Sequence, residues 1–163
     1  METIPEELVE ETWQEVASFS PDKIRKGMTK LSGGQPYLTA FMMEFAQDLD
    51  QEVKELAVYM FFVVYQMFQK SSEGKIKRIS PEKIIECYEQ NENLMESMEG
   101  IHEKFFERIA RVQLSGQPYV LKYVVETLIE APEEEDPIEL TEEDVGFLFL
   151  LLKTVVDVID KQK

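Results

Sequence analysis

Residues 51–70 read QEVKELAVYMFFVVYQMFQK, and this stretch decides the fold class. The β-branched and aromatic run Val58–Tyr65 resembles a strand when it is taken alone. It belongs, however, to a stretch without glycine or proline that is too long for an ordinary strand, which favours a helix. A second apolar run lies at Val145–Leu152. We therefore predict two helices, near 53–69 and 142–160, that are buried on all sides.

Three further positions carry the residues expected at the beginning of a helix. Ser20 and Ser80 each precede a proline, which suits an N-cap followed by the first helical position. Thr141 precedes three acidic residues, and carboxylates there favour the positive end of the helix dipole. The sequence therefore predicts helices that begin at residues 21, 81 and 142.

Apolar residues recur at helical spacing between these starts. Val9, Trp13 and Val16 share one face of a first helix, and a similar face runs from Met95 to Val112. No convincing alternating strand pattern is present. The sequence predicts an all-α protein, a helical bundle or short α-helical repeat of about seven or eight helices.

The composition describes one acidic globular domain over residues 1–163. Of 163 residues, 33 are acidic and 17 basic, which gives a formal net charge of -16. Such a surface repels phosphate, so nucleic acids and anionic membranes are not expected as partners. No apolar run approaches the roughly 20 residues of a membrane-spanning helix. The acidic start of the sequence lacks the basic and apolar regions of a secretory signal, and we expect a cytoplasmic location.

A short motif occurs twice in the chain. LSGGQPYL at 31–38 recurs as LSGQPYV at 114–120, one glycine shorter. The following FMME at 41–44 aligns with YVVE at 123–126. We interpret this correspondence, together with the two long apolar helices, as an internal duplication.

The duplication would divide the domain into two multi-helix units. The first would cover about 1–70 and the second about 81–163, with a polar linker over 71–80. Each unit contains one helix that is too apolar to be solvated alone. Packing the units together would bury both of these helices against each other at the centre.

The repeated motif supplies the candidate ligand- or partner-binding residues, which are Gln35, Tyr37, Gln117 and Tyr119. Glycines ahead of a helix expose backbone N–H groups that attract anions, and these four side chains would add contacts from two sides. A structural interpretation is simpler. Gly33 and Gly116 suit the left-handed position that ends one helix, and the prolines suit the first turn of the next.

Other candidate sites lack essential residues. Glu99 and His102 have the spacing of a di-iron ligand pair, but His102 is the only histidine. Residues 48–53 begin like a calcium loop but carry Val53 where the turn requires glycine. Cys87, the only cysteine, has apolar neighbours and is expected in the core. We predict no metal, no cofactor and no catalytic residue.

Two classes of function remain. The first is a non-catalytic helical module that binds a protein partner or self-associates, for example as a homodimer. The near-absence of catalytic residue types favours it, and so do the 8 methionines, because methionine-rich apolar surface adapts to varied partners, although methionine is more often simply a core residue. The alternative is a small-molecule-binding protein or a hydrolytic enzyme with its site between the two units.

Overall fold

The computed structural model describes residues 1–97, 116–130 and 138–162. These residues form seven α-helices and no strand, which confirms the all-α prediction. The predicted face from Met95 to Val112 runs beyond Ser97 into residues outside this description, and so do Glu99 and His102. The helices are α1 (Glu6–Ala17), α2 (Pro21–Gly34), α3 (Pro36–Ala46), α4 (Gln51–Ser71), α5 (Pro81–Ser97), α7 (Pro118–Glu130) and α8 (Glu142–Asp160).

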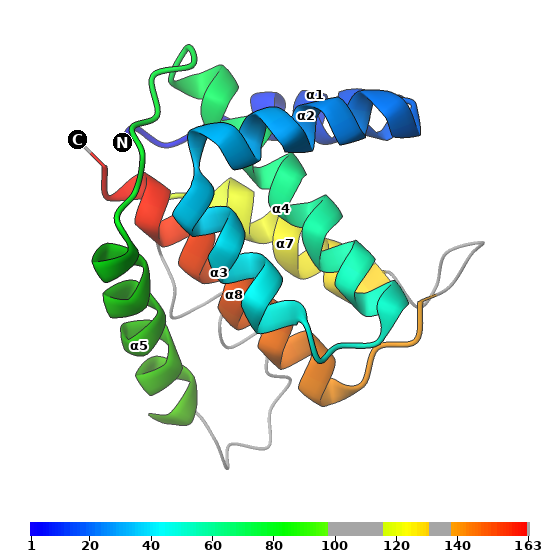
Figure 1. Ribbon diagram of the computed structural model, residues 1–163. Coiled ribbons are helices and arrows are strands. Elements are labelled where there is room, and N and C mark those ends of the chain that lie inside the picture. The colour runs from blue at the N-terminus through cyan, green and yellow to red at the C-terminus, as the bar shows by residue number, and fades with distance from the viewer. Residues whose placement is uncertain (98–115, 131–137, 163) are drawn as a thin grey trace.

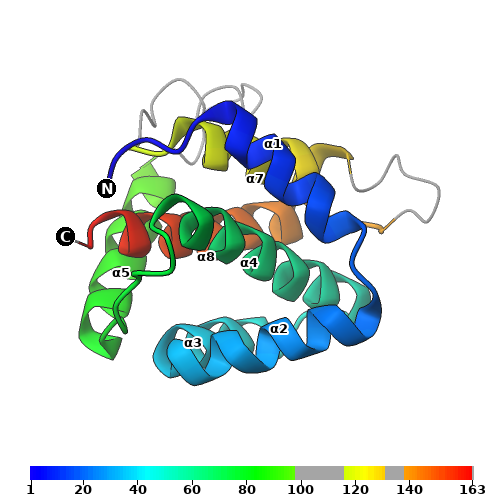
Figure 2. The same ribbon diagram turned by 90° about the horizontal axis from the view of Figure 1, so that it is seen from above.

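The two apolar helices, α4 and α8, form the middle layer of the molecule (Figure 1). Figure 2 shows α1 and α7 on one side of this layer and α2 and α3 on the other. α5 crosses at one end and packs along α8. Because α4 and α8 contact each other directly, the predicted meeting of these two helices at the centre is confirmed. The internal duplication stays a prediction.

Burial explains why these two helices lie at the centre. Every residue from Leu148 to Ile159 in α8 is buried, and so is every residue from Met60 to Tyr65 in α4. Each large apolar side chain removed from water contributes about 1.5–3 kcal/mol. α2 can approach α4 closely because Gly27 has no side chain, and a Cβ there would lie 2.6 Å from the Phe62 ring. None of the described helices is both long enough and apolar enough to cross a lipid bilayer.

The predicted helix beginnings are confirmed. The Ser20 hydroxyl accepts a hydrogen bond from the Lys23 N–H (3.2 Å), and α2 begins at the proline between them. α5 likewise begins at Pro81, directly after Ser80. At α8, Thr141 and Asp144 form a reciprocal capping box.

The prediction that Gly33 and Gly116 adopt the left-handed backbone conformation is wrong. α2 continues through Gly34, and only Gln35 separates it from α3. Gln35 makes the bend itself, with φ −130° and ψ 65°, while its N–H donates to the Leu31 carbonyl (2.8 Å). In the described part of the chain, only Glu73 and Gly74 have positive φ. Gly116 instead lies close to Asp160, and a Cβ there would be 2.6 Å from Oδ2, so that the carboxylate would have to shift.

Candidate functional site

Gln117 holds the segment that leads into α1. Its side chain is fully buried. The Oε1 atom accepts a hydrogen bond from the Ile4 N–H (2.9 Å), while Nε2 donates to the Glu2 carbonyl (2.9 Å) and to Oδ1 of Asp160 (2.8 Å). Gln117 therefore fixes the segment before α1 against the end of α8.

Gln35 holds the segment that leads into α5 in the same manner. Its buried amide accepts from the Ile79 N–H (3.0 Å) and donates to the Lys77 carbonyl (2.8 Å). Both glutamines thus bond the carbonyl of one residue and the N–H of the residue two positions later, just before a helix. We call each of these arrangements a glutamine anchor. Buried amide groups require hydrogen-bond partners, so the anchors explain why both copies of the repeated motif contain glutamine.

The four predicted site residues do not form one site. One copy of the repeated motif leads into α3 and the other into α7, and these two helices lie on opposite sides of the middle layer (Figure 2). The amides of Gln35 and Gln117 are engaged by backbone groups, whereas Tyr37 and Tyr119 are 46% and 38% exposed. Of the four, Tyr119 lines a cavity together with residues of α1 and α4.

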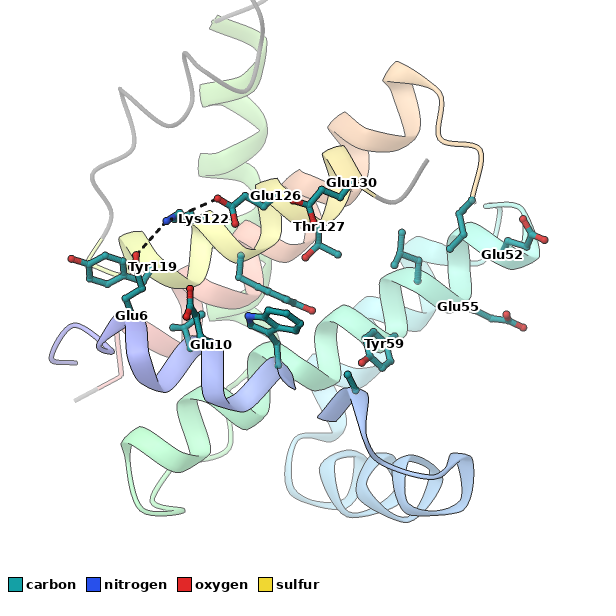
Figure 3. Close-up of a pocket in the computed structure, with 16 residues that line it drawn as sticks. Glu6, Glu10, Glu52, Glu55, Tyr59, Tyr119, Lys122, Glu126, Thr127 and Glu130 are labelled. Carbon is teal, nitrogen blue, oxygen red and sulfur yellow. Dashed lines mark hydrogen bonds and ion pairs between the residues drawn. The ribbon is translucent and has the colours of Figure 1, made fainter. Parts of the chain in front are cut away.

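That cavity is an open groove of about 820 Å³ between α1, α4 and α7 (Figure 3). We call it the acidic groove. Its aromatic lining comes from all three helices, and its members are Trp13, Tyr59, Tyr119 and Tyr123. Trp13, the only tryptophan of the chain, is 39% exposed, so a large aromatic surface faces the groove and the solvent. Aromatic rings that are held rigidly and left accessible are typical of binding surfaces.

The charge of the groove lining is strongly negative. Six glutamates against one lysine leave five net negative charges; they are Glu6, Glu10, Glu52, Glu55, Glu126 and Glu130. Lys122 Nζ lies 3.3 Å from Oε2 of Glu6 and 4.0 Å from Oε1 of Glu126. The hydrogen bond that Lys122 donates to Glu6, and then the charges of both glutamates, raise the pKa of Lys122 above its usual value. The lysine stays charged, but it cannot neutralise the groove.

A second polar cluster is buried between α5 and α8. Lys153 Nζ donates to Oδ1 of Asn91 (2.7 Å) and to Oδ2 of Asp157 (2.5 Å). Asn91 Nδ2 donates in turn to Asp157 and to the Thr154 hydroxyl, both at 3.2 Å. Cys87 lies beside this cluster in the core, as predicted, and burial raises its pKa to about 11. The thiol is therefore protonated at neutral pH and unsuited to nucleophilic chemistry.

The described residues contain no group of three or more histidine, cysteine, aspartate or glutamate side chains that could hold a metal ion. In the segment that resembles a calcium loop, Asp50 is the N-cap of α4 and Val53 is buried in its first turn. His102 and the acidic run 133–136 lie outside the described residues.

The groove was missed by sequence reasoning. Helical spacing assigns Trp13 to the same face as Val9 and Val16, and the structure buries only the two valines. The available signal was the spacing of the glutamates, since Glu6 and Glu10, like Glu126 and Glu130, are four residues apart. This spacing places each pair on one helix face, but it does not indicate which helices meet.

The chain matches no protein-family model, and no curated protein or solved structure shows significant similarity to it.

Proposed function

We propose that this protein is a non-catalytic helical interaction module and that the acidic groove is the surface that binds its protein partner. The observation that carries the proposal is the accessible aromatic lining of an 820 Å³ groove, which includes the exposed Trp13. Tryptophan and tyrosine supply large contact areas with little loss of conformational freedom, and they dominate binding energy at protein interfaces.

The shape of the groove supports a protein partner. Its lining residues on α1 extend from Glu6 to Ala17, and those on α7 from Tyr119 to Glu130. The α1 and α7 walls are therefore each about three helical turns, roughly 16 Å, long, and the α4 wall, from Glu52 to Tyr59, is about two turns long. Grooves of this form receive a row of side chains from a helix laid along them.

The alternative function, a small-molecule site between the two predicted units, is supported by the position of the groove. α1 and α4 belong to the first 70 or so residues and α7 to the second unit, and 820 Å³ is within the usual range for ligand pockets. The described lining contains no histidine, cysteine or serine, so hydrolysis in the groove would have to use its glutamates as general acid and base. Self-association and the cytoplasmic location stay predictions.

The test compares three baits in affinity enrichment from a cell extract with quantitative mass spectrometry. The baits are the native protein, Trp13→Ala and, as a matched control, Met43→Ala. Met43 is 38% exposed but lies on α3, on the other side of the middle layer. We expect a partner that the native and Met43→Ala baits retain and that Trp13→Ala loses.

The enriched protein is then purified and titrated against the same three baits, and sedimentation of the native protein alone reports self-association. Equal retention by all three baits, or equal loss from both variants, would refute the proposed groove. Circular dichroism of Trp13→Ala separates a lost contact from a lost fold.

A further inference from the structure

Each wall of the acidic groove carries a pair of carboxylates. The α1 and α7 pairs are spaced four residues apart and the α4 pair three, so each pair lies on one helix face. Figure 3 shows Glu6 near Tyr119 at one end of the groove and Glu52 and Glu55 at the other. The negative charge therefore surrounds the aromatic lining on three sides.

These carboxylates exceed the positive charge available to them. Lys122 is the one cation of the described lining, and it is shared by Glu6 and Glu126. Among the residues that the structure describes, Glu52 and Glu130 take part in no ion pair, and Glu10 acts on Lys122 only through its charge. The groove thus combines an aromatic surface with carboxylates whose charge a cationic partner would neutralise.

The groove matches a helix in length. Its α1 and α7 walls are roughly 16 Å long, which corresponds to about three turns of a helix. A helix laid along these walls places one row of apolar side chains between them, and its flanks lie at the rim. On that rim, side chains that flank the apolar row face the glutamates.

We infer that the occupant of the groove is a basic amphipathic helix of a partner protein, an inference that rests on the proposed function. Its apolar row contacts Trp13 and Tyr59, and lysine or arginine side chains beside that row meet the carboxylates of the three walls. Arginine also stacks on exposed aromatic rings, which adds a cation–π contribution. An acidic helix would be repelled by the same carboxylates.

Among the described residues, the basic stretch from Lys70 to Arg78 is engaged elsewhere. Lys70 pairs with Glu15, and the guanidinium of Arg78 donates to the Gly33 carbonyl (3.3 Å). The backbone of Lys77 is held by Gln35 and by Gln162. This segment is therefore fixed beside the corner of α2 and α3 rather than in the groove.

Trp13 provides a direct readout, since it is the only tryptophan. Its fluorescence is followed during titration with a synthetic amphipathic peptide of about 18 residues that carries a leucine row flanked by lysines. Two further peptides are a version with glutamate in place of lysine and a scrambled version of the basic peptide. Spermine represents a small cationic ligand without an apolar row.

Two quadruple variants test the role of the carboxylates at equal net charge. The groove variant is E10Q/E52Q/E55Q/E130Q. The control variant changes four exposed acids that do not line the groove, E44Q/E82Q/E86Q/E89Q. We expect the groove variant to weaken binding of the basic peptide by about 10-fold or more at low salt, and the control by less than about 2-fold. Raising NaCl from about 50 to about 500 mM should weaken native binding in the same direction.

Each other outcome overturns the inference in a recognisable way. Equal weakening by the two variants would show general attraction to an acidic surface, and equal binding of the scrambled peptide or of spermine would replace the helix with a simple cation. Tighter binding of the glutamate peptide would show that the groove prefers an acidic helix and not a basic one. If the natural partner binds through Trp13 but is indifferent to the groove variant, the proposed function stands and only the basic helix is refuted. If no binding depends on Trp13, both fail.

Discussion

The protein contains the same lysine–carboxylate pair in two different surroundings. Lys153 and Asp157 are four residues apart on α8, with side chains only 4% and 12% exposed. Lys122 and Glu126 have the same spacing on α7, with side chains about half exposed. Asn91 completes the hydrogen bonds of the buried pair. The exposed pair borders a groove whose lining contains more carboxylates than positive charges. Burial, rather than pair chemistry, decides whether such a pair serves the fold or is available for binding.

Removing each lysine tests this comparison with the largest expected effect. Lys153→Met leaves the carboxyl group of Asp157 buried without its cation, and we expect a loss of about 3–5 kcal/mol of unfolding free energy. Lys122→Met should leave the urea midpoint unchanged, because solvent screens its exposed partners. Denaturation followed by circular dichroism measures both variants.

A compensating variant distinguishes a lost ion pair from poor packing. K153M combined with D157L and N91L replaces the polar cluster with apolar side chains and should recover most of the lost stability. No recovery would indicate that the shape of Lys153, rather than its charge, supports the contact between α5 and α8.

The glutamine anchor at Gln117 provides a second comparison, of intermediate size. Gln117→Ala removes the partners of the Ile4 N–H and the Glu2 carbonyl, and we expect a loss of about 1–3 kcal/mol. Tyr119→Ala, two residues later, should change stability by less than about 0.5 kcal/mol and instead weaken binding in the groove. Similar losses of stability in both variants would contradict this division of roles.

The smallest effect concerns Cys87 and alkaline pH. Burial, followed by the charge of Asp157, raises the pKa of this thiol from 9.0 to about 11. The thiol loses its proton near pH 9 in the unfolded chain and only near pH 11 in the folded protein. The free energy of unfolding therefore keeps its full value below pH 9 and decreases as the pH rises toward 11. Cys87→Ala should lose less stability than the native protein between about pH 8 and 10.5. Parallel curves for the two proteins would show that the thiol does not contribute.

Much of the fold was predictable because it depends on local chemistry. The capping residues at Ser20, Ser80 and Thr141 each act within one helical turn, and the structure confirms all three helix beginnings. The pairing of α4 and α8 was predictable because no other arrangement buries two helices of such apolar character.

The candidate site was not predictable, because its parts come from distant segments. The acidic groove joins residues 6–17, 52–59 and 119–130, and no local pattern reports that these meet. The role of Gln35 depends on Ile79, and that of Gln117 on Ile4. Lys153 and Asp157 interrupt an apolar helix, and only the position of Asn91 on α5 explains them.

The anchor at Gln117 also constrains the order of events during protein synthesis. Ile4 and Gln117 are separated by 113 residues, so the ribosome completes α1 long before its anchoring side chain exists. Until then α1 can pack against α4, but the segment that leads into α1 has no hydrogen-bond partner in Gln117. The entry to the first helix is consequently among the last parts of the molecule to become fixed.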